Sequence, residues 1–585
     1  MKKNLFLIIT ILLSSCGDYT KLPQETEDAL QKSGKNFNEL FDVIVRYKDT
    51  DTMKLHAANF LIANAQYKYF LDTIDGERIC DLEVLTAQTL TNNIDLAFDA
   101  YQKSWNKNLW FDDFKEFLLP YRIADEKLSN WRRDFAENYS DSLLSDSIDT
   151  PEKVAQIVND EIIENYPDFT NCNDFAMRAT FIMRSCGIPV ALAIIPHWGT
   201  RAESHIFNVL KTQNELIDFL GGENTFGSHL AGFHDNIPKV YMLCFSKQTD
   251  SPHSKYPKEE KPAFFKNIFL KDITAQLSSI VTSDYQLNID SRNKLAYLCV
   301  FDRIGWIPVA YGEIKDKKVN FNNVGINVVY QLATFEDGEI NCIGNPFLAL
   351  KNGEIRNYNP SENTFNQTLT RKSPESNRWE EVEKQIPGGK FQGANREDFS
   401  DSVTLFTITE IPDLKFQQAE VANYQKFRYL RYLSSNKTYG NMAEVEFYDS
   451  NEKKLQHKRV FGQYKPSLWF PDFTAEKLFD GDVLTFFHTS DSLAWGAIEL
   501  DAPQAVSKIR YKIRNDDNGI RSGEIYELFY AKDGSWISFG KQTAAHDDEI
   551  TFKNLPKNAL FWLRNLSKGT EERIFEVDDS EIVWR

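Results

Sequence analysis

The hydrophobic pattern of this chain changes its period along the sequence, and that change limits the folds available to it. Over residues 25–139, apolar residues recur at steps of three and four, which is typical of packed helices. Over residues 270–371 and 426–585, apolar and aromatic runs are short, and turn signals such as Asp337-Gly338 interrupt them, which is typical of strands. A chain of 585 residues is also too long for one core. We therefore expect a multidomain α+β protein.

The same patterns divide the chain into segments. Residues 372–415 are charged and contain Pro387-Gly388-Gly389, which indicates a linker or an irregular connection. We expect a signal peptide at 1–16, a helical domain at 17–149, an α+β core at 150–250, a β-sandwich at 265–371, the linker at 372–415 and a further β-sandwich at 420–585.

The N-terminus has the pattern of an export signal. Lys2-Lys3 precedes an apolar stretch from Leu5 to Leu13, which is too short to cross a bilayer as a helix. The next residues, Ser14-Ser15-Cys16, complete a sequence that resembles a bacterial lipobox with Cys16 as the lipidated residue. An ordinary cleaved signal with a chance cysteine is the alternative. We expect a lipid anchor at Cys16 and a place in the bacterial cell envelope, on the outer membrane and facing either the periplasm or the surface.

Charge and cysteine spacing argue against several kinds of partner. The net charge of −18 and the pI near 5.1 make nucleic acid an unsuitable partner. The six cysteines after Cys16 are scattered, without a CxxC pair or a Cys/His spacing that suits zinc. We expect no metal and no cofactor from these residues.

The segment around Cys172 has the residue types of a cysteine hydrolase. An apolar stripe predicts a helix that begins at Cys172 and is ended by Gly187. The apolar run at 190–195 predicts a strand, His205 lies on the following strand, and Asp218 lies on the strand that returns. A thiolate can attack an amide carbonyl, an imidazole can take and return the proton, and a carboxylate can orient the imidazole.

The expected geometry permits this chemistry and leaves other roles open. A helix N-terminus favours a thiolate and offers N–H groups to an oxyanion. If the loop after the His205 strand has two or four residues, Asp218 lies on the same sheet face as His205, one pair along the diagonal. If the loop has three residues, Asp218 does not share that face. Taken singly, Cys172 could be a small buried cap, His205 a satisfied strand residue and Asp218 a surface carboxylate.

The series Cys172…Arg184-Ser185-Cys186-Gly187-Ile188-Pro189-Val190…His205…Asp218 resembles the core of the transglutaminase-like superfamily. Upstream, Trp131-Arg132 resembles the extended form of this family found in large Bacteroidetes-type lipoproteins. The resemblance implies a papain-like core in which Cys172 is the nucleophile, His205 the general base and acid, and Asp218 the orienting carboxylate.

Departures from the family pattern keep a second interpretation open. Asn173 stands where an aromatic residue is often found, Phe207 replaces a frequent tryptophan, and no proline follows Asp218. The candidates for lining the cleft are Asn171, Trp198 and Arg201. Structural roles for Trp198 and Arg201 are the alternative.

The C-terminal block is similar to discoidin-type, galactose-binding-like jelly rolls. The resemblance rests on Asp480-Gly481-Asp482 and on the strand that Trp495 begins. It implies carbohydrate binding by loops at one end, where rings stack on sugars and polar groups pair with hydroxyls. Some members hold a structural calcium, but no loop here has a clear motif for one. The candidate glycan contacts are Phe487, His488, Asn515 and Asp516. A domain that only packs against the others is the alternative.

Two functions follow from these resemblances. The first is an exported lipoprotein hydrolase that acts on amide bonds of a peptide, glycopeptide or peptidoglycan-derived substrate, with hydrolysis preferred over cross-linking. Its C-terminal module would hold it near glycan. The second is a catalytically silent surface lipoprotein that binds glycan or a protein partner.

Overall fold

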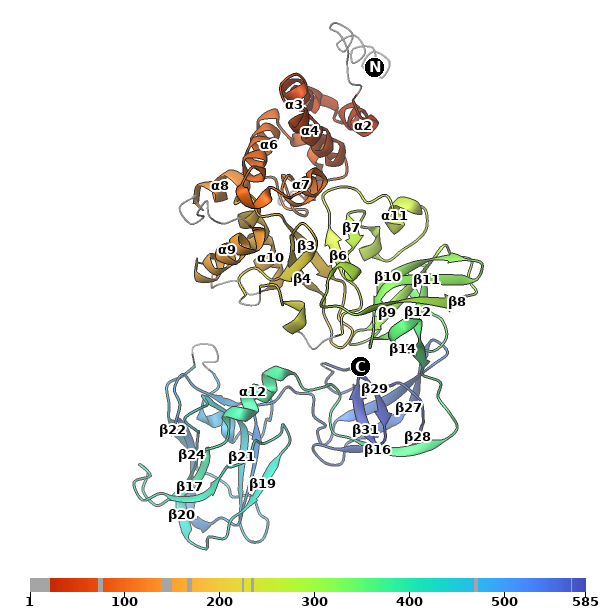
Figure 1. The fold of residues 1–585 in the computed structure, drawn as a ribbon. Helices are drawn as coiled ribbons and strands as arrows, with labels where there is room; N and C mark the ends of the chain where they lie inside the picture. Colours follow the sequence, from red (N-terminus) through yellow and green to blue (C-terminus); the bar gives the residue numbers. More distant parts are fainter. Residues whose placement is uncertain are drawn as a thin grey trace. The chain divides into compact units, whose positions relative to one another are not determined.

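The chain forms two compact units, Met1–Asn357 and Tyr358–Arg585 (Figure 1). The computed structural model describes residues 22–71, 77–138, 150–165, 171–223, 226–232, 236–467, 472–569 and 571–585. The expected signal peptide and Cys16 lie outside these ranges. The first unit combines helices with antiparallel sheets and the second is built mainly of strands, which confirms a multidomain α+β protein.

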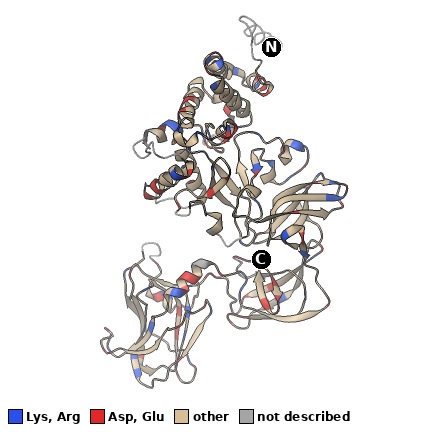
Figure 2. Cartoon of the chain, in the orientation of Figure 1, with Lys and Arg blue, Asp and Glu red and all other residues tan. Residues whose placement is uncertain are grey.

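Two further features of the described ranges bear on partners. None of the described helices is both long and apolar enough to cross a membrane. Acidic and basic residues are interspersed along the ribbon of each unit (Figure 2).

The N-terminal part of the first unit is helical, as the three-and-four spacing predicts. On α3, for example, Leu40, Val43, Ile44 and Tyr47 are buried on one face. A β-hairpin of β1 (Tyr69–Leu71) and β2 (Arg78–Cys80) adds to the predicted helices. The helices are α2 (Gln24–Lys32), α3 (Phe37–Lys48), α4 (Thr52–Ala65), α5 (Asp81–Val84), α6 (Ala87–Tyr101), α7 (Phe111–Phe117) and α8 (Trp131–Asn138).

The next part packs two helices against a five-stranded antiparallel sheet of order β5-β4-β3-β6-β7. Gly187, at φ +81°, ends the second helix, and the Ile188 N–H donates to the Met183 carbonyl at 2.8 Å, as in a Schellman cap. The elements are α9 (Pro151–Asn165), α10 (Cys172–Ser185), β3 (Val190–Ile195), β4 (His205–Lys211), β5 (Leu216–Phe219), β6 (Tyr241–Leu243) and β7 (Leu270–Asp272).

Asn208 joins α10 to this sheet. Its side chain is fully buried, and Nδ2 donates to the Ala176 carbonyl at 2.9 Å and to Thr180 Oγ1 at 3.0 Å. Its Oδ1 accepts the Gly221 N–H at 3.1 Å. These three hydrogen bonds fix the helix, β4 and the segment after β5 to one another, so the position of Cys172 depends on a residue in the middle of β4.

The β-sandwich expected at 265–371 is instead a single eight-stranded antiparallel sheet. Alternate residues of β9 face two different cores: Leu298 belongs to one, while Tyr297 packs with Tyr241 and Phe265 of the preceding part. A second sheet is therefore replaced by side chains of the α+β core. The strands, in chain order, are β8 (Thr282–Asn288), β9 (Leu295–Phe301), β10 (Trp306–Lys315), β11 (Lys318–Gly325), β12 (Val329–Glu336), β13 (Glu339–Cys342), β14 (Phe347–Ala349) and β15 (Ile355–Asn357).

The linker expected at 372–415 is wrong, because this segment supplies two strands of a β-sandwich in the second unit. Phe391 is fully buried in the sandwich core, and its strand pairs with β20. After α12 (Asn377–Gln385), one sheet contains β17 (Lys390–Ala394), β18 (Val403–Thr407), β20 (Lys426–Leu433), β22 (Arg459–Gln463) and β24 (Trp495–Ala505). The other contains β19 (Gln417–Glu420), β21 (Gly440–Tyr448), β23 (Phe487–His488) and β25 (Lys508–Ile513).

The segment 420–585 is also more than one sandwich, because its last third forms a separate sheet. β16 (Thr364–Leu369) pairs with β28 (Ile550–Pro556). Its Leu369 side chain is buried in the same hydrophobic core as Tyr526 and Phe575. The sheet contains β26 (Ile525–Lys532), β27 (Ser535–Thr543), β29 (Phe561–Asn565), β30 (Ile574–Asp578) and β31 (Glu581–Trp584).

Candidate functional site

Cys172 is the first residue of α10, and its thiol is half-buried. Asn171 caps the helix: its Oδ1 accepts the Asp174 N–H at 3.0 Å, and its Nδ2 donates to the Asp174 carboxylate at 2.8 Å. A capped helix of 14 residues presents partial positive charge and free N–H groups at this end. Such a helix end can donate N–H groups to a developing oxyanion. Asn171, expected in the cleft wall, is an exposed cap.

His205 lies at the start of β4 in an aromatic surround. Its ring is 5.4 Å from Trp198 and 5.9 Å from Phe207, measured between centroids. Its Nε2 lies 2.8 Å from Nε2 of His229, and Nδ1 of His229 lies 3.2 Å from a carboxylate oxygen of Glu223. The three side chains form a hydrogen-bonded chain, which we call the His205–His229–Glu223 chain.

The hydrogen bonds of this chain assign the tautomers. If His229 donates from Nδ1 to the Glu223 carboxylate, its Nε2 has a lone pair and accepts from Nε2–H of His205. His205 then carries its basic lone pair on Nδ1. Burial, followed by the nearby charges of His229 and Arg201, lowers the pKa of His205 to about 4. The hydrogen bond from His229 lowers the pKa of Glu223. His205 is therefore neutral above about pH 5, as a general base must be.

Asp218 shares the sheet face of His205 but lies too far along the hairpin to orient it. The connecting loop has the four residues that this parity requires, and Asp218 pairs with Val209. Val209 is four positions after His205, which separates them by about 13 Å along the strand. The Asp218 carboxylate instead accepts the Leu230 N–H at 2.6 Å. Asp218 thus fixes the turn that carries His229, and the orienting position beside His205 is taken by His229.

Cys172 and His205 lie at the same end of the α+β core, but the structure does not join them. Arg184, at the other end of α10, donates to the Val190 carbonyl at the start of β3, so the helix runs toward the far end of β4. Strand alternation places His205 on the face opposite Asn208, the residue that contacts α10. Both residues are described, and no hydrogen bond links the thiol of Cys172 to the imidazole.

The other cleft candidates are structural in this arrangement. Trp198 is almost fully buried and forms the wall behind the His205 ring. The guanidinium of Arg201 lies 4.5 Å above the Trp198 ring. Both residues therefore shape the surroundings of His205, and the tryptophan does not line an open cleft.

The glycan candidates of the second unit are largely engaged in packing. Phe487 is fully buried in the sandwich core, so its assignment as an exposed stacking ring is wrong. His488 is half-buried, and its Nδ1 lies 3.0 Å from Asn441 Oδ1. Asn515 donates to the Val483 carbonyl at 2.8 Å, and Asp516 is ion-paired with Arg371. Asn515 and Asp516 thus hold a loop in place.

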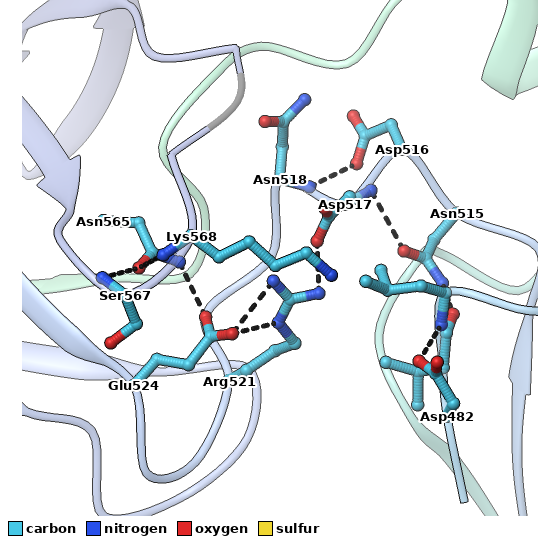
Figure 3. Close-up of polar contacts among 12 residues, drawn as sticks. Asp482, Asn515, Asp516, Asp517, Asn518, Arg521, Glu524, Asn565, Ser567 and Lys568 are labelled. Carbon is cyan, nitrogen blue, oxygen red and sulfur yellow. Dashed lines mark hydrogen bonds and ion pairs between the residues drawn. The ribbon is translucent and has the colours of Figure 1, made fainter.

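A polar cavity of about 360 Å³ lies beside this loop. Figure 3 shows Arg521 reaching toward Asp517 and Glu524, with a 3.0 Å contact to Glu524. Asn565 donates to the other Glu524 oxygen at 2.6 Å. The lining combines acidic and basic side chains: Glu444, Glu446, Asp482, Glu524 and Asp547 with Arg510, Arg521 and Lys568. Sequence reasoning found only the neighbouring loop.

Within the described ranges, no group of three or more His, Cys, Asp or Glu side chains is arranged to hold a metal ion. Comparison of the chain with known protein families and with curated proteins gives no match.

Proposed function

We propose that this protein is a lipid-anchored amide hydrolase of the bacterial cell envelope, with Cys172 as nucleophile and His205 as general base. The observation that carries the proposal is the His205–His229–Glu223 chain at the same end of the core as a half-buried helix-terminal thiol. Lipidation would occur at Cys16, and the substrate would be a peptide, glycopeptide or peptidoglycan fragment.

In the proposed reaction, Nδ1 of His205 takes the thiol proton as sulfur attacks the amide carbonyl. The N–H groups at the start of α10 would stabilise the oxyanion, and the imidazolium would return the proton to the leaving amine. Water would then release the acid from the acyl-enzyme. Since His205 faces away from α10, the proposed reaction requires the start of β4 to rearrange as substrate binds, so that the imidazole reaches the thiol.

Iodoacetamide labelling of each cysteine tests the proposed pair. Cys342 is also half-buried, and burial raises its pKa to about 11, so it serves as an internal reference. We expect Cys172 to react at least about tenfold faster than Cys342 at pH 7, and to lose that advantage in His205→Ala. Equal rates for the two thiols would contradict the proposal, as would a Cys172 rate that is indifferent to His205.

The pH dependence of hydrolysis provides a second test. His205 must be neutral to accept a proton, and its pKa is lowered to about 4. For muropeptide or peptide amides cleaved in a Cys172-dependent manner, we expect kcat/KM to fall on acidification only near pH 4. An acidic limb near pH 6.5, the ordinary value for histidine, would show that His205 is not the base.

A second function, a catalytically silent protein that binds glycan, is favoured by the absence of a thiol–imidazole bond at Cys172 and by the polar cavity of the second unit. The carboxylates and guanidinium groups that line it can accept from and donate to the hydroxyls of a sugar. A glycan array with the full chain separates the two functions. The silent binder would be supported if glycan binding weakens in Glu524→Gln and if iodoacetamide labels Cys172 and Cys342 at equal rates.

A further inference from the structure

A cavity of the first unit lies outside the candidate catalytic residues. It has a volume of about 750 Å³, which is in the usual range for small-molecule sites. Its walls come from the end of α4 and the β1–β2 hairpin, from residues 123–125, and from the segment between β6 and β7. The polar and aromatic side chains of the lining include Lys68, Arg78, Asp125, His253, Lys266 and Phe269.

Lys68 is the unusual member of this wall. Its side chain is only 5 % exposed, and its ammonium lies 3.3 Å from the centre of the Phe269 ring and 4.8 Å from that of Phe245. Among the described residues, no carboxylate lies within ion-pair distance of it. The nearest acids are engaged elsewhere: Asp81 pairs with Arg122, and Glu116 accepts the Phe245 N–H. A buried ammonium without a counter-charge is costly, and an anionic ligand would supply that counter-charge.

The rest of the wall adds positive charge and open hydrogen-bonding capacity. The Arg78 guanidinium lies 3.2 Å from the centre of the ring of Tyr69, the residue that follows Lys68, and Lys266 is an exposed member of the lining. Nδ1 of His253 is buried without a hydrogen-bond partner. Against these, Asp125 is the acidic side chain of the lining. A cationic cavity in a chain of net charge −18 is a local exception to the overall charge.

We propose that this cavity, the Lys68 pocket, binds a small organic anion, whose carboxylate or phosphate group pairs with Lys68 and Arg78 while its body lies against Tyr67, Tyr69 and Phe269. Arginine and lysine both favour such groups, and aromatic faces accept sugar or apolar rings. The pocket lies outside the Cys172 and His205 region, so the proposal stands independently of amide hydrolysis.

Binding should depend on pH through the same lysine. Burial, followed by the charge of Arg122, lowers the pKa of Lys68 to about 7. Lys68 therefore loses its positive charge above neutral pH. The affinity for an anion that binds the protonated amine must then fall as the pH rises, toward a limit of about tenfold per pH unit. The groups that face Lys68 from its surroundings are Arg122, Glu116, Asp81 and Cys244, and in the cavity wall Arg78, Asp125, His253 and Lys266.

Calorimetric titration of the full chain with galacturonate, galactose and inorganic phosphate tests the proposal. At pH 6 we expect at least one of the two anions to bind and galactose, the neutral match of galacturonate, not to bind. Binding of galacturonate but not phosphate would identify a carboxylate ligand, and binding of phosphate but not galacturonate would identify a phosphate ligand. If neither anion binds, or if galactose binds as well as galacturonate, the proposal is overturned.

Variants separate a binding role from a structural one. Lys68→Met keeps the side-chain volume and removes a buried charge, so we expect the melting temperature to stay or rise while anion affinity falls at least about tenfold. Lys247→Met is the matched control, since Lys247 lies over Tyr67 at 4.9 Å but outside the cavity wall. A Lys68→Met protein that melts earlier and binds anions normally would show a purely structural lysine. Anion affinity that is unchanged from pH 6 to 9 would exclude Lys68 as the binding group.

Discussion

Asp81→Asn is expected to destabilise the helical part of the first unit by about 3–5 kcal/mol. Asp81 is fully buried at the start of α5. One carboxylate oxygen accepts from Arg122 at 2.7 Å, and the other accepts from the Tyr121 hydroxyl at 2.8 Å. Asparagine has a single side-chain acceptor, so one donor would face an N–H group. Arg122, itself 1 % exposed, would keep its charge without a counter-charge.

Two further variants make this prediction specific. Asp95→Asn removes a carboxylate that also has two cationic partners, Lys54 at 2.7 Å and Arg46 at 3.3 Å, but this site is partly exposed. We expect a loss below about 1 kcal/mol there. Arg122→Met in the Asp81→Asn background should recover part of the stability, because it removes the orphaned charge. Urea unfolding followed by far-ultraviolet circular dichroism measures all three. Equal losses for Asp81→Asn and Asp95→Asn would contradict the argument.

Local patterns in the sequence predicted most of what surrounds Cys172. The helix from Cys172, its end at Gly187, the strand at 190–195 and the strand that begins at His205 are all fixed by residues close together in the chain. Hydrophobic periodicity and helix caps depend on residues close together in the sequence, so they can be predicted without knowledge of the tertiary structure. The polar sequence before β5 indicated a turn but left its length open, and the structure has four residues between β4 and β5.

The hydrogen-bonding partners of the site could not be predicted in the same way. His229 reaches His205 from a turn 24 residues later, and that turn is held by Asp218. No spacing in the sequence marks His229, because its contact depends on how a loop returns across the sheet. The expected register put Asp218 one pair along the diagonal from His205, whereas in the structure Asp218 pairs with Val209, four positions after His205.

The errors in domain boundaries have a similar cause. The charged composition of residues 372–415 and Pro387-Gly388-Gly389 indicated an irregular connection, yet the segment contains β17, where a Cβ at Gly393 would lie 2.4 Å from the Phe427 ring. The glycine permits close packing against a strand more than thirty residues later, and that pairing is nonlocal. The Lys68 pocket is likewise assembled from three distant segments, so a helical pattern alone gave no sign of it.

Gly221→Ala is expected to push α10 away from the sheet, at a cost of about 1–3 kcal/mol. A Cβ at Gly221 would lie 2.0 Å from Cβ of Ala179, on the face of α10 that Asn208 holds. Neither atom can move without its backbone, so the helix must shift or lose its hydrogen bonds to Asn208. Because Cys172 is the first residue of the same helix, its iodoacetamide labelling rate should change together with stability.

A double-mutant cycle tests whether this one contact is responsible. Ala179→Gly alone should cost about 1 kcal/mol, as glycine does inside a helix. Combined with Gly221→Ala, however, it removes the clash, so the double variant should be more stable than Gly221→Ala alone and should regain the wild-type labelling rate of Cys172. Gly305→Ala is the control, since a Cβ there meets no atom within 4 Å. Additive losses in the cycle would show that Ala179 does not limit the approach of α10, and that the position of Cys172 is set elsewhere.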